Sequence, residues 1–298
     1  MTLSFTVSIS QTDDKNKKFV EICRLEHKIF AKDALARWPD ARLWTSPGQF
    51  SFPIRSVPNS YVWGRDVSGV LDTSSLEEMT NSTNLLPSWT DEIEYETLES
   101  GTFRVGLSPV TLYETAFFHK KSKSLIVTDA LIRVPSVPPV LNDPDKLLLI
   151  SKRSTSDPLP ADSLEARTIG WEKTALLVSY FFPEHEEFDP VTPGVVTWTE
   201  GWHDNFLALS NRLLVPPVVR ELLYAKNPTS VRRWVDRVSG RWDFQKIVPA
   251  HFEAPIVANS ADFRRAFEFL EDNTIDAFPA NDLARGLKPI ADLVLGRK

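Results

Sequence analysis

The sequence predicts a layered α/β (α+β) fold in which helices cover a sheet. Three observations carry this prediction. The middle of the chain has the pattern of an apolar β-hairpin, helix-type periodicity lies on both sides of it, and one short strand, KIVPAHF, follows two or three helices near the end. Intermixed strand and helix signals of this kind are typical of a sheet with helices packed outside it.

The first predicted element is a helix over residues 18–38. At about 100° per residue, one side of this helix collects apolar residues: Phe19, Cys23, Phe30 and Ala34. Glu26 and His27 fall on the margins of the same side. Two interpretations stay open for this pair, a solvated helix edge or an inward-facing carboxylate and imidazole.

Three strands are predicted after this helix. ARLWTSPG (41–48) reads as a strand stopped by proline and glycine, and VTLYETAFF (110–118) with SLIVTD (124–129) reads as a hairpin. His119 lies in the turn HKKSKS beside two lysines, which indicates a solvated loop residue. The prolines of residues 134–144 exclude regular structure there.

The rest of the chain is predicted to be mainly helical. Residues 162–182 have a helical pattern, and EHEEFDPVTPG (184–194) reads as an acidic loop in which His185 belongs to a solvated charge run or to a weak metal cluster. Pro217 suits a first helical turn, a glycine stop ends TSVRRWVDRVSG, and Asn259 or Ser260 caps a last helix. His203 lies in the first helix of this region, where packing or surface exposure is expected.

Composition restricts the function classes. Lys+Arg 34 against Asp+Glu 40 leaves a net charge of −6, so no concentrated basic surface is available for nucleic acid. Cys23 is the single cysteine, which excludes an intrachain disulfide and a thiolate metal cluster. The longest apolar run, TALLVSYFF, is too short to span a membrane, and no glycine-rich phosphate loop is present. We therefore expect neither a nucleic-acid partner nor a membrane span.

Two predicted strands end on residues that could bind a ligand. SLIVTD ends on Asp129, and KIVPAHF carries His251 next to its end. Strand ends of layered α/β proteins collect functional groups, and imidazole with carboxylate oxygen suits zinc, iron or manganese. The alternatives are a turn-forming aspartate and a packed histidine.

Three blocks of the chain, residues 25–53, 113–135 and 231–256, resemble a family of unknown function that is common in phototrophs and described as metallo-β-lactamase-like. The resemblance implies an αββα sandwich with metal ligands at one edge of two facing sheets. It implies a single domain over residues 21–298, which follows a polar N-terminal segment over 1–20. The compartment stays open: a soluble intracellular location is expected, and the resemblance adds the plastid as an option.

The resemblance also implies site residues. Glu26 and His27 match the last two residues of an H-x-H-x-D-H block, Asp129 matches a bridging aspartate, and His251 matches a closing histidine. The earlier histidines are replaced by ICRL (22–25), and the opening strands of one sheet are not recognisable. The implied metal ligands are His27, Asp129 and His251, for one zinc, iron or manganese ion or for none.

Three hypotheses follow. In the first, the fold carries a depleted metal site and is non-catalytic or weakly active, binding a small molecule or a protein. In the second, it is a mononuclear metal-dependent hydrolase of a phosphate, ester or thioester, in which Glu26 or Asp129 orients the attacking water. In the third, the chain is an unrelated α+β interaction protein.

Overall fold

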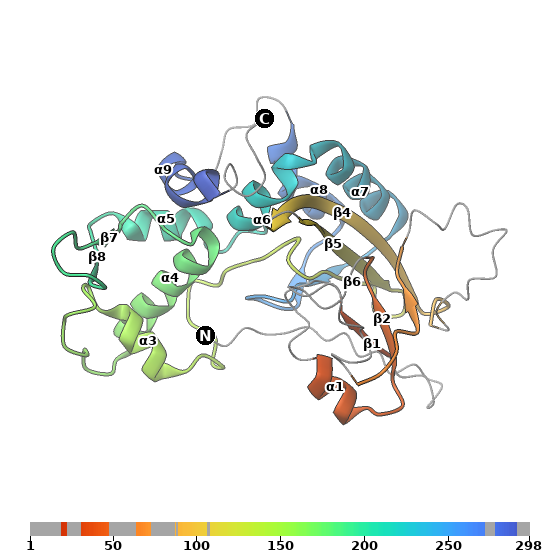
Figure 1. Cartoon of the computed structure of the whole chain (residues 1–298), viewed down its shortest axis with the longest axis horizontal. Helices are drawn as coiled ribbons and strands as arrows, with labels where there is room; N and C mark the ends of the chain where they lie inside the picture. The colour runs from red at the N-terminus through yellow and green to blue at the C-terminus, as the bar shows by residue number, and fades with distance from the viewer. Residues whose placement is uncertain are drawn as a thin grey trace. The chain divides into compact units, whose positions relative to one another are not determined.

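A computed structural model describes residues 19–22, 31–47, 64–72, 87, 89–105, 108–271 and 278–290. The chain divides into two compact units, and each is considered by itself (Figure 1). The sheet unit comprises the described residues within Ser4–Leu131 and Asn227–Phe267. The helical unit comprises those within Ile132–Lys226 and Glu268–Lys298.

The sheet unit contains two sheets. The first is parallel, in the order β1 (Phe19–Ile22), β2 (Arg42–Thr45), β3 (Gly69–Val70). The second is mixed, in the order β10 (Ile256–Val257), β9 (Lys246–Val248), β6 (Ser124–Ile126), β5 (Ser108–His119), β4 (Ile93–Val105). In the second sheet only β6 and β9 run parallel. The helices of this unit are α1 (Ala31–Arg37), α7 (Pro228–Arg241) and α8 (Ser260–Ala266).

The two sheets face each other across an aromatic core. Trp89 packs edge-on against Trp44 of β2, Tyr95 of β4 and Phe117 of β5, with ring centroids 5.8 to 6.2 Å apart. Gly69 lies opposite Trp44 in register, and a Cβ there would come within 2.1 Å of the indole ring. Only glycine therefore lets β3 approach β2 at this point.

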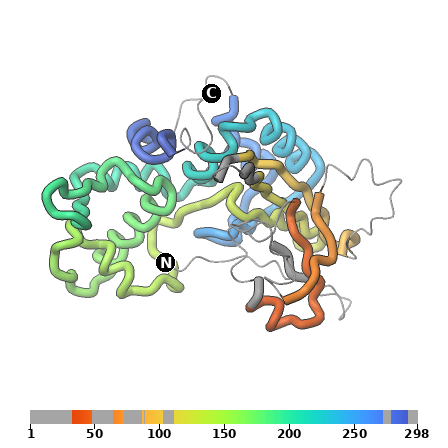
Figure 2. Tube along the Cα trace, in the orientation of Figure 1, coloured from red at the N-terminus to blue at the C-terminus, as the bar shows by residue number. Residues whose placement is uncertain are grey.

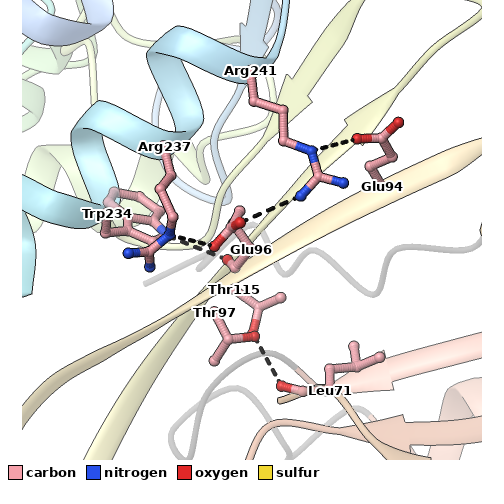
Figure 3. Close-up of polar contacts among 8 residues, drawn as sticks. All are labelled: Leu71, Glu94, Glu96, Thr97, Thr115, Trp234, Arg237 and Arg241. Atoms are coloured by element: carbon pink, nitrogen blue, oxygen red, sulfur yellow. Dashed lines mark hydrogen bonds and ion pairs between the residues drawn. The ribbon is translucent and has the colours of Figure 1, made fainter. Parts of the chain in front are cut away.

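A chain of buried hydroxyl groups also joins the two sheets. Thr115 on β5 lies 3.1 Å from the Ser46 hydroxyl and 3.2 Å from the Thr97 hydroxyl, and Thr97 donates to the Leu71 carbonyl at 2.8 Å (Figure 3). Polar groups removed from water need such partners. The chain therefore satisfies hydroxyls that would otherwise be costly inside the sandwich.

Successive residues of β2 pack on opposite layers. Trp44 belongs to the core between the sheets, whereas Leu43 packs with Ala34 and Leu35 of α1. On the far side of the second sheet lie α7 and α8, and Figure 1 shows α1, β1 and β2 on the opposite side. The layers of the sheet unit therefore follow the order helix, sheet, sheet, helix.

Helix α7 is attached to β4 by polar contacts (Figure 3). The Glu96 carboxylate, 6% exposed, accepts from Arg237 Nε at 3.0 Å and from Arg241 Nη1 at 3.4 Å. Arg241 also pairs with Glu94 at 2.9 Å, and Trp234 donates its ring N–H to the Glu96 carbonyl. Hydrogen bonding by Trp242 and Lys120, together with the Arg241 charge, lowers the pKa of Glu94 against the opposing effect of its burial.

The helical unit carries the remaining described elements. They are α3 (Pro144–Ser151), α4 (Leu164–Tyr180), the hairpin β7 (Glu186–Phe188) and β8 (Val196–Trp198), α5 (Trp202–Leu209), α6 (Pro217–Leu222), η3 (Tyr224–Lys226), η4 (Glu268–Leu270), α9 (Ala280–Asp282) and the π-helix η5 (Leu283–Leu287). Helices α3 and α4 come into close contact at Gly170, where an added Cβ would collide with the Leu147 carbonyl. None of the helices in the described part of the chain has the length and apolar character needed for a membrane span.

Lys173 of α4 caps the end of α3. Its ammonium donates to the carbonyls of Ser151 (3.0 Å) and Lys152 (2.7 Å), and it lies 5.3 Å from the ring centroids of both Trp198 and Trp202. The residue is 2% exposed, and this burial lowers its pKa to about 8. A buried ammonium is retained here because helix-terminal carbonyls and aromatic faces both favour a cation.

The structure confirms the predicted mixed α and β architecture and several elements. The strand at 41–48, the hairpin, the helix at 162–182, the Pro217 helix start and the Asn259 cap are all present, the last as a capping box. The helix predicted over 18–38 is wrong at its start, because Phe19–Ile22 forms β1 in parallel register with β2. Sheet hydrogen bonding there overrides a local helical periodicity.

Three further expectations need correction. No strand was predicted where β4 lies, and the acidic loop predicted at 184–194 contains strand β7. His119 is the last residue of β5, with Nδ1 2.6 Å from the Ser122 hydroxyl, whereas a solvated loop residue was predicted.

Replacement of Glu96 tests the attachment of α7. Glu96→Gln removes the charge that two arginines share in a buried position, so we expect the free energy of unfolding to fall by about 1–3 kcal/mol. Asp243→Asn is the matched control, because its pair with Lys123 is exposed and should contribute no more than about 1 kcal/mol. Urea denaturation measures both, and equal losses would contradict this role of Glu96.

The pH dependence of stability tests the burial of Lys173. Its pKa is about 8 in the folded chain and 10.5 when unperturbed, so between these pH values the unfolded chain binds more protons. Its contribution is therefore fully present above pH 10.5 and is lost as the pH falls through 8. From pH 8 to 10.5 the wild type should gain up to about 3 kcal/mol relative to Lys173→Met. Urea denaturation showing a constant difference would contradict the lowered pKa.

Candidate functional site

The candidate site begins with the parallel pairing of β6 and β9. The whole stretch Ile132–Lys226 lies between these strands in sequence, as the colours of Figure 2 show. Ile126 pairs with Val248, and hydrogen bonds continue past both strands, from Val127 N to Val248 O and from Ala250 N to Thr128 O, each 3.1 Å. Backbone hydrogen bonding between the two segments therefore continues for two more residues, to Thr128 and Ala250.

This register brings Asp129 and His251 together. Nε2 of His251 lies 2.8 Å from Oδ1 of Asp129, and the side chains are 20% and 12% exposed. The distance fits a hydrogen bond between the ring nitrogen and the carboxylate. Both side chains therefore keep some contact with solvent, His251 more than Asp129.

Glu114 of β5 lies behind the loop that carries Asp129. The residue is completely buried, and its Oε1 accepts the backbone N–H of Thr128 at 2.7 Å while Oε2 accepts that of Asp129 at 3.4 Å. Sequence reasoning did not single it out. One feature of the sequence could have pointed to Glu114. It lies between Leu112 and Ala116 on the same face of an apolar strand, and a carboxylate buried in such a place needs hydrogen-bonding partners.

The backbone next to His251 is strained. Phe252 has φ +64°, in the left-handed region that costs a bulky L-residue of the order of 1–3 kcal/mol. Such strain persists only where the surrounding structure holds the chain in place. It turns the chain sharply at the residue after the histidine, away from the direction of β9.

The structure leaves the positions of the other predicted site residues untested. Glu26 and His27 lie outside the described residues. Among the remaining histidines, His203 Nδ1 lies 3.0 Å from Glu172 Oε2, and His185 Nδ1 lies 3.3 Å from the Thr199 hydroxyl. These contacts belong to the helical unit.

The donor set decides how well a metal ion fits. Asp129 and His251 supply an oxygen and a nitrogen of the types that zinc, iron and manganese accept, but protein zinc sites use three or four protein ligands. Within the part of the chain that the structure describes, no group of three or more His, Cys, Asp or Glu side chains has the arrangement of a metal site. The described residues therefore provide an incomplete ligand set and no dinuclear centre.

Comparison with known proteins gives one family match. The model of the DUF4336 family, a domain of unknown function, matches residues 16–269, which include both strands of the candidate site. No curated protein and no solved structure matches the chain. Because the match covers most of the sequence, the chain belongs to the DUF4336 family of domains of unknown function.

Proposed function

We propose that this protein is a metallo-β-lactamase-like domain with a depleted metal site, which binds at most one divalent ion, weakly, and acts as a binding module with little or no hydrolytic activity. The observation that carries the proposal is the contact of His251 Nε2 with Asp129 Oδ1 at the ends of two parallel strands. The pair supplies the two kinds of donor atom that a hydrolase metal site uses, a nitrogen and an oxygen. It supplies fewer ligands than such a site needs.

The layer order of the sheet unit supports the fold part of this proposal. Two sheets face each other, with α1 outside one and α7 outside the other. An αββα sandwich has the same order, and the resemblance of three sequence blocks to metallo-β-lactamase-like proteins points in the same direction. In that resemblance Asp129 and His251 occupy ligand positions, which agrees with their convergence at one sheet edge.

The number of ligands supports the weak-binding part. A single imidazole and a single carboxylate hold an ion far less firmly than the three or four ligands of structural or catalytic zinc. We therefore expect a dissociation constant weaker than about 1 μM for zinc or manganese. A ligand held at this edge would contact His251 and Asp129 through hydrogen bonds as readily as through a metal ion.

A mononuclear hydrolase of a phosphate, ester or thioester is the second candidate. Two observations favour it, the partial exposure of both side chains and the strained backbone at Phe252, because strain of this kind clusters at active sites. His27 would be the third ligand in this version, as the resemblance implies.

Calorimetric titration of metal-stripped protein with Zn²⁺ and with Mn²⁺ tests the proposal. We expect one weak site in the wild type and at least tenfold weaker binding in Asp129→Ala and His251→Ala, since each variant removes one of two donors. His203→Ala is the matched control, because this histidine is exposed and pairs with Glu172 in the helical unit. It should bind like the wild type.

The same proteins are assayed with bis(p-nitrophenyl) phosphate, p-nitrophenyl acetate and an acyl thioester. Rates that do not differ between the wild type and the two site variants agree with the proposed module. Tight, stoichiometric metal binding by the wild type, together with hydrolysis that is lost in Asp129→Ala, would contradict the binding module and support the mononuclear hydrolase. Unchanged metal binding in both site variants would remove Asp129 and His251 from the site altogether.

A further inference from the structure

We propose that Glu114 is the positioning residue of the Asp129–His251 pair, acting through the backbone amides of Thr128 and Asp129. This inference rests on the proposed function in one respect, because it assumes that Asp129 and His251 are the groups that bind the ligand. Glu114 itself does not touch the ligand. It holds the peptide from which the Asp129 side chain projects.

The geometry of the contact supports this role. The two carboxylate oxygens of Glu114 accept from two successive backbone amides, at 2.7 Å and 3.4 Å. Because both oxygens belong to one rigid planar group, they fix the two successive peptide groups that join Val127 to Thr128 and Thr128 to Asp129. Two side-chain oxygens that accept from successive amides hold the loop after β6 more firmly than a turn by itself would.

The burial of Glu114 is hard to explain by packing of the sheet alone. It is completely buried on β5, between Leu112 and Ala116 on one strand face, where a leucine would pack at no electrostatic cost. Glu96 on the neighbouring strand is also a buried carboxylate, and it accepts from two arginines of α7. Two of the groups that compensate Glu114 belong to the loop that carries Asp129, which indicates what the carboxylate is there to hold.

Hydrogen bonds therefore connect Glu114 to the segments that carry both members of the pair. Thr128 accepts a hydrogen bond from Ala250 through its carbonyl and donates one to Glu114 through its amide. The residues just before Asp129 and just before His251 are therefore bonded to each other, and one of them is bonded to Glu114. Loss of the carboxylate should loosen Asp129 relative to His251 while leaving the sheet intact.

The test compares Glu114→Gln and Glu114→Leu with the control Glu96→Gln. Glutamine keeps one oxygen acceptor for one amide but offers an NH2 donor toward the other, so it should have an intermediate effect. Leucine removes both acceptors. Glu96→Gln also alters a buried carboxylate of the same sheet and lowers overall stability, but the contacts that it changes are to Arg237 and Arg241 of α7, so it should leave the site unchanged.

Two readouts separate positioning from stability. Amide hydrogen exchange at Thr128 and Asp129, measured by NMR, should accelerate at least about tenfold more than exchange at Leu125 and Ile247 in the sheet. Zn²⁺ affinity should fall by about tenfold or more in Glu114→Leu, as for other residues that support metal ligands, with Glu114→Gln in between and Glu96→Gln equal to the wild type.

Wild-type exchange at both loop amides and wild-type affinity in folded Glu114→Leu would overturn the inference. If Glu114→Leu does not fold, Glu114→Gln decides by the same two readouts. If the wild type binds no metal, the metal-binding part of the proposed function fails, but the exchange measurement still decides whether Glu114 holds the loop.

Discussion

The parallel pairing of β6 with β9 is the constraint on which the candidate site depends. These strands are contributed by segments on either side of Ile132–Lys226. Joining them requires ordering a long connection, and the entropic cost grows only slowly with its length. Leu125 and Ile247 lie opposite each other in the pairing and are completely buried. Burial of this pair contributes to holding the strands together. The hydrogen bonds that follow then place Asp129 and His251 next to each other.

Contacts on both faces of this sheet fix the position of its strands. On one face, Glu94 and Glu96 meet Arg237 and Arg241 of α7. On the other, aromatic rings and a chain of hydroxyls join it to the parallel sheet. Because a strand exposes alternate residues on alternate faces, a slip of one residue would place glutamates among the aromatic rings. The polar contacts of β4 therefore help to select one register.

The sequence predicted the parts of the fold that follow from local patterns. The hairpin, the helix over 162–182 and the Asn259 cap depend on periodicity or capping chemistry, which are readable within a short window. Strand β4 escaped detection because Glu94 and Glu96 occupy a buried face that normally carries apolar residues. Their arginine partners lie on α7, far away in sequence, so no local pattern could show that these charges are compensated.

The candidate site, like the fold, was predictable from the sequence only where local patterns determine it. Asp129 and His251 could be named from the ends of two apolar segments, although β6 and β9 end three residues before Asp129 and His251. Their contact depends on the pairing of distant strands, which local patterns do not specify. Glu114 was missed because its partners are backbone amides, and backbone groups leave no trace in a sequence. The assignment of Glu26 and His27 rests on resemblance alone.

A double-mutant cycle on Asp129 and His251 tests the central claim most directly. The free energy of unfolding is measured for the wild type, Asp129→Ala, His251→Ala and the double variant. If the two side chains are bonded directly, as the 2.8 Å contact indicates, the cycle gives a coupling energy of about 1–2 kcal/mol. Additive effects, within about 0.5 kcal/mol, would contradict the account that β6 and β9 bring these residues into one site.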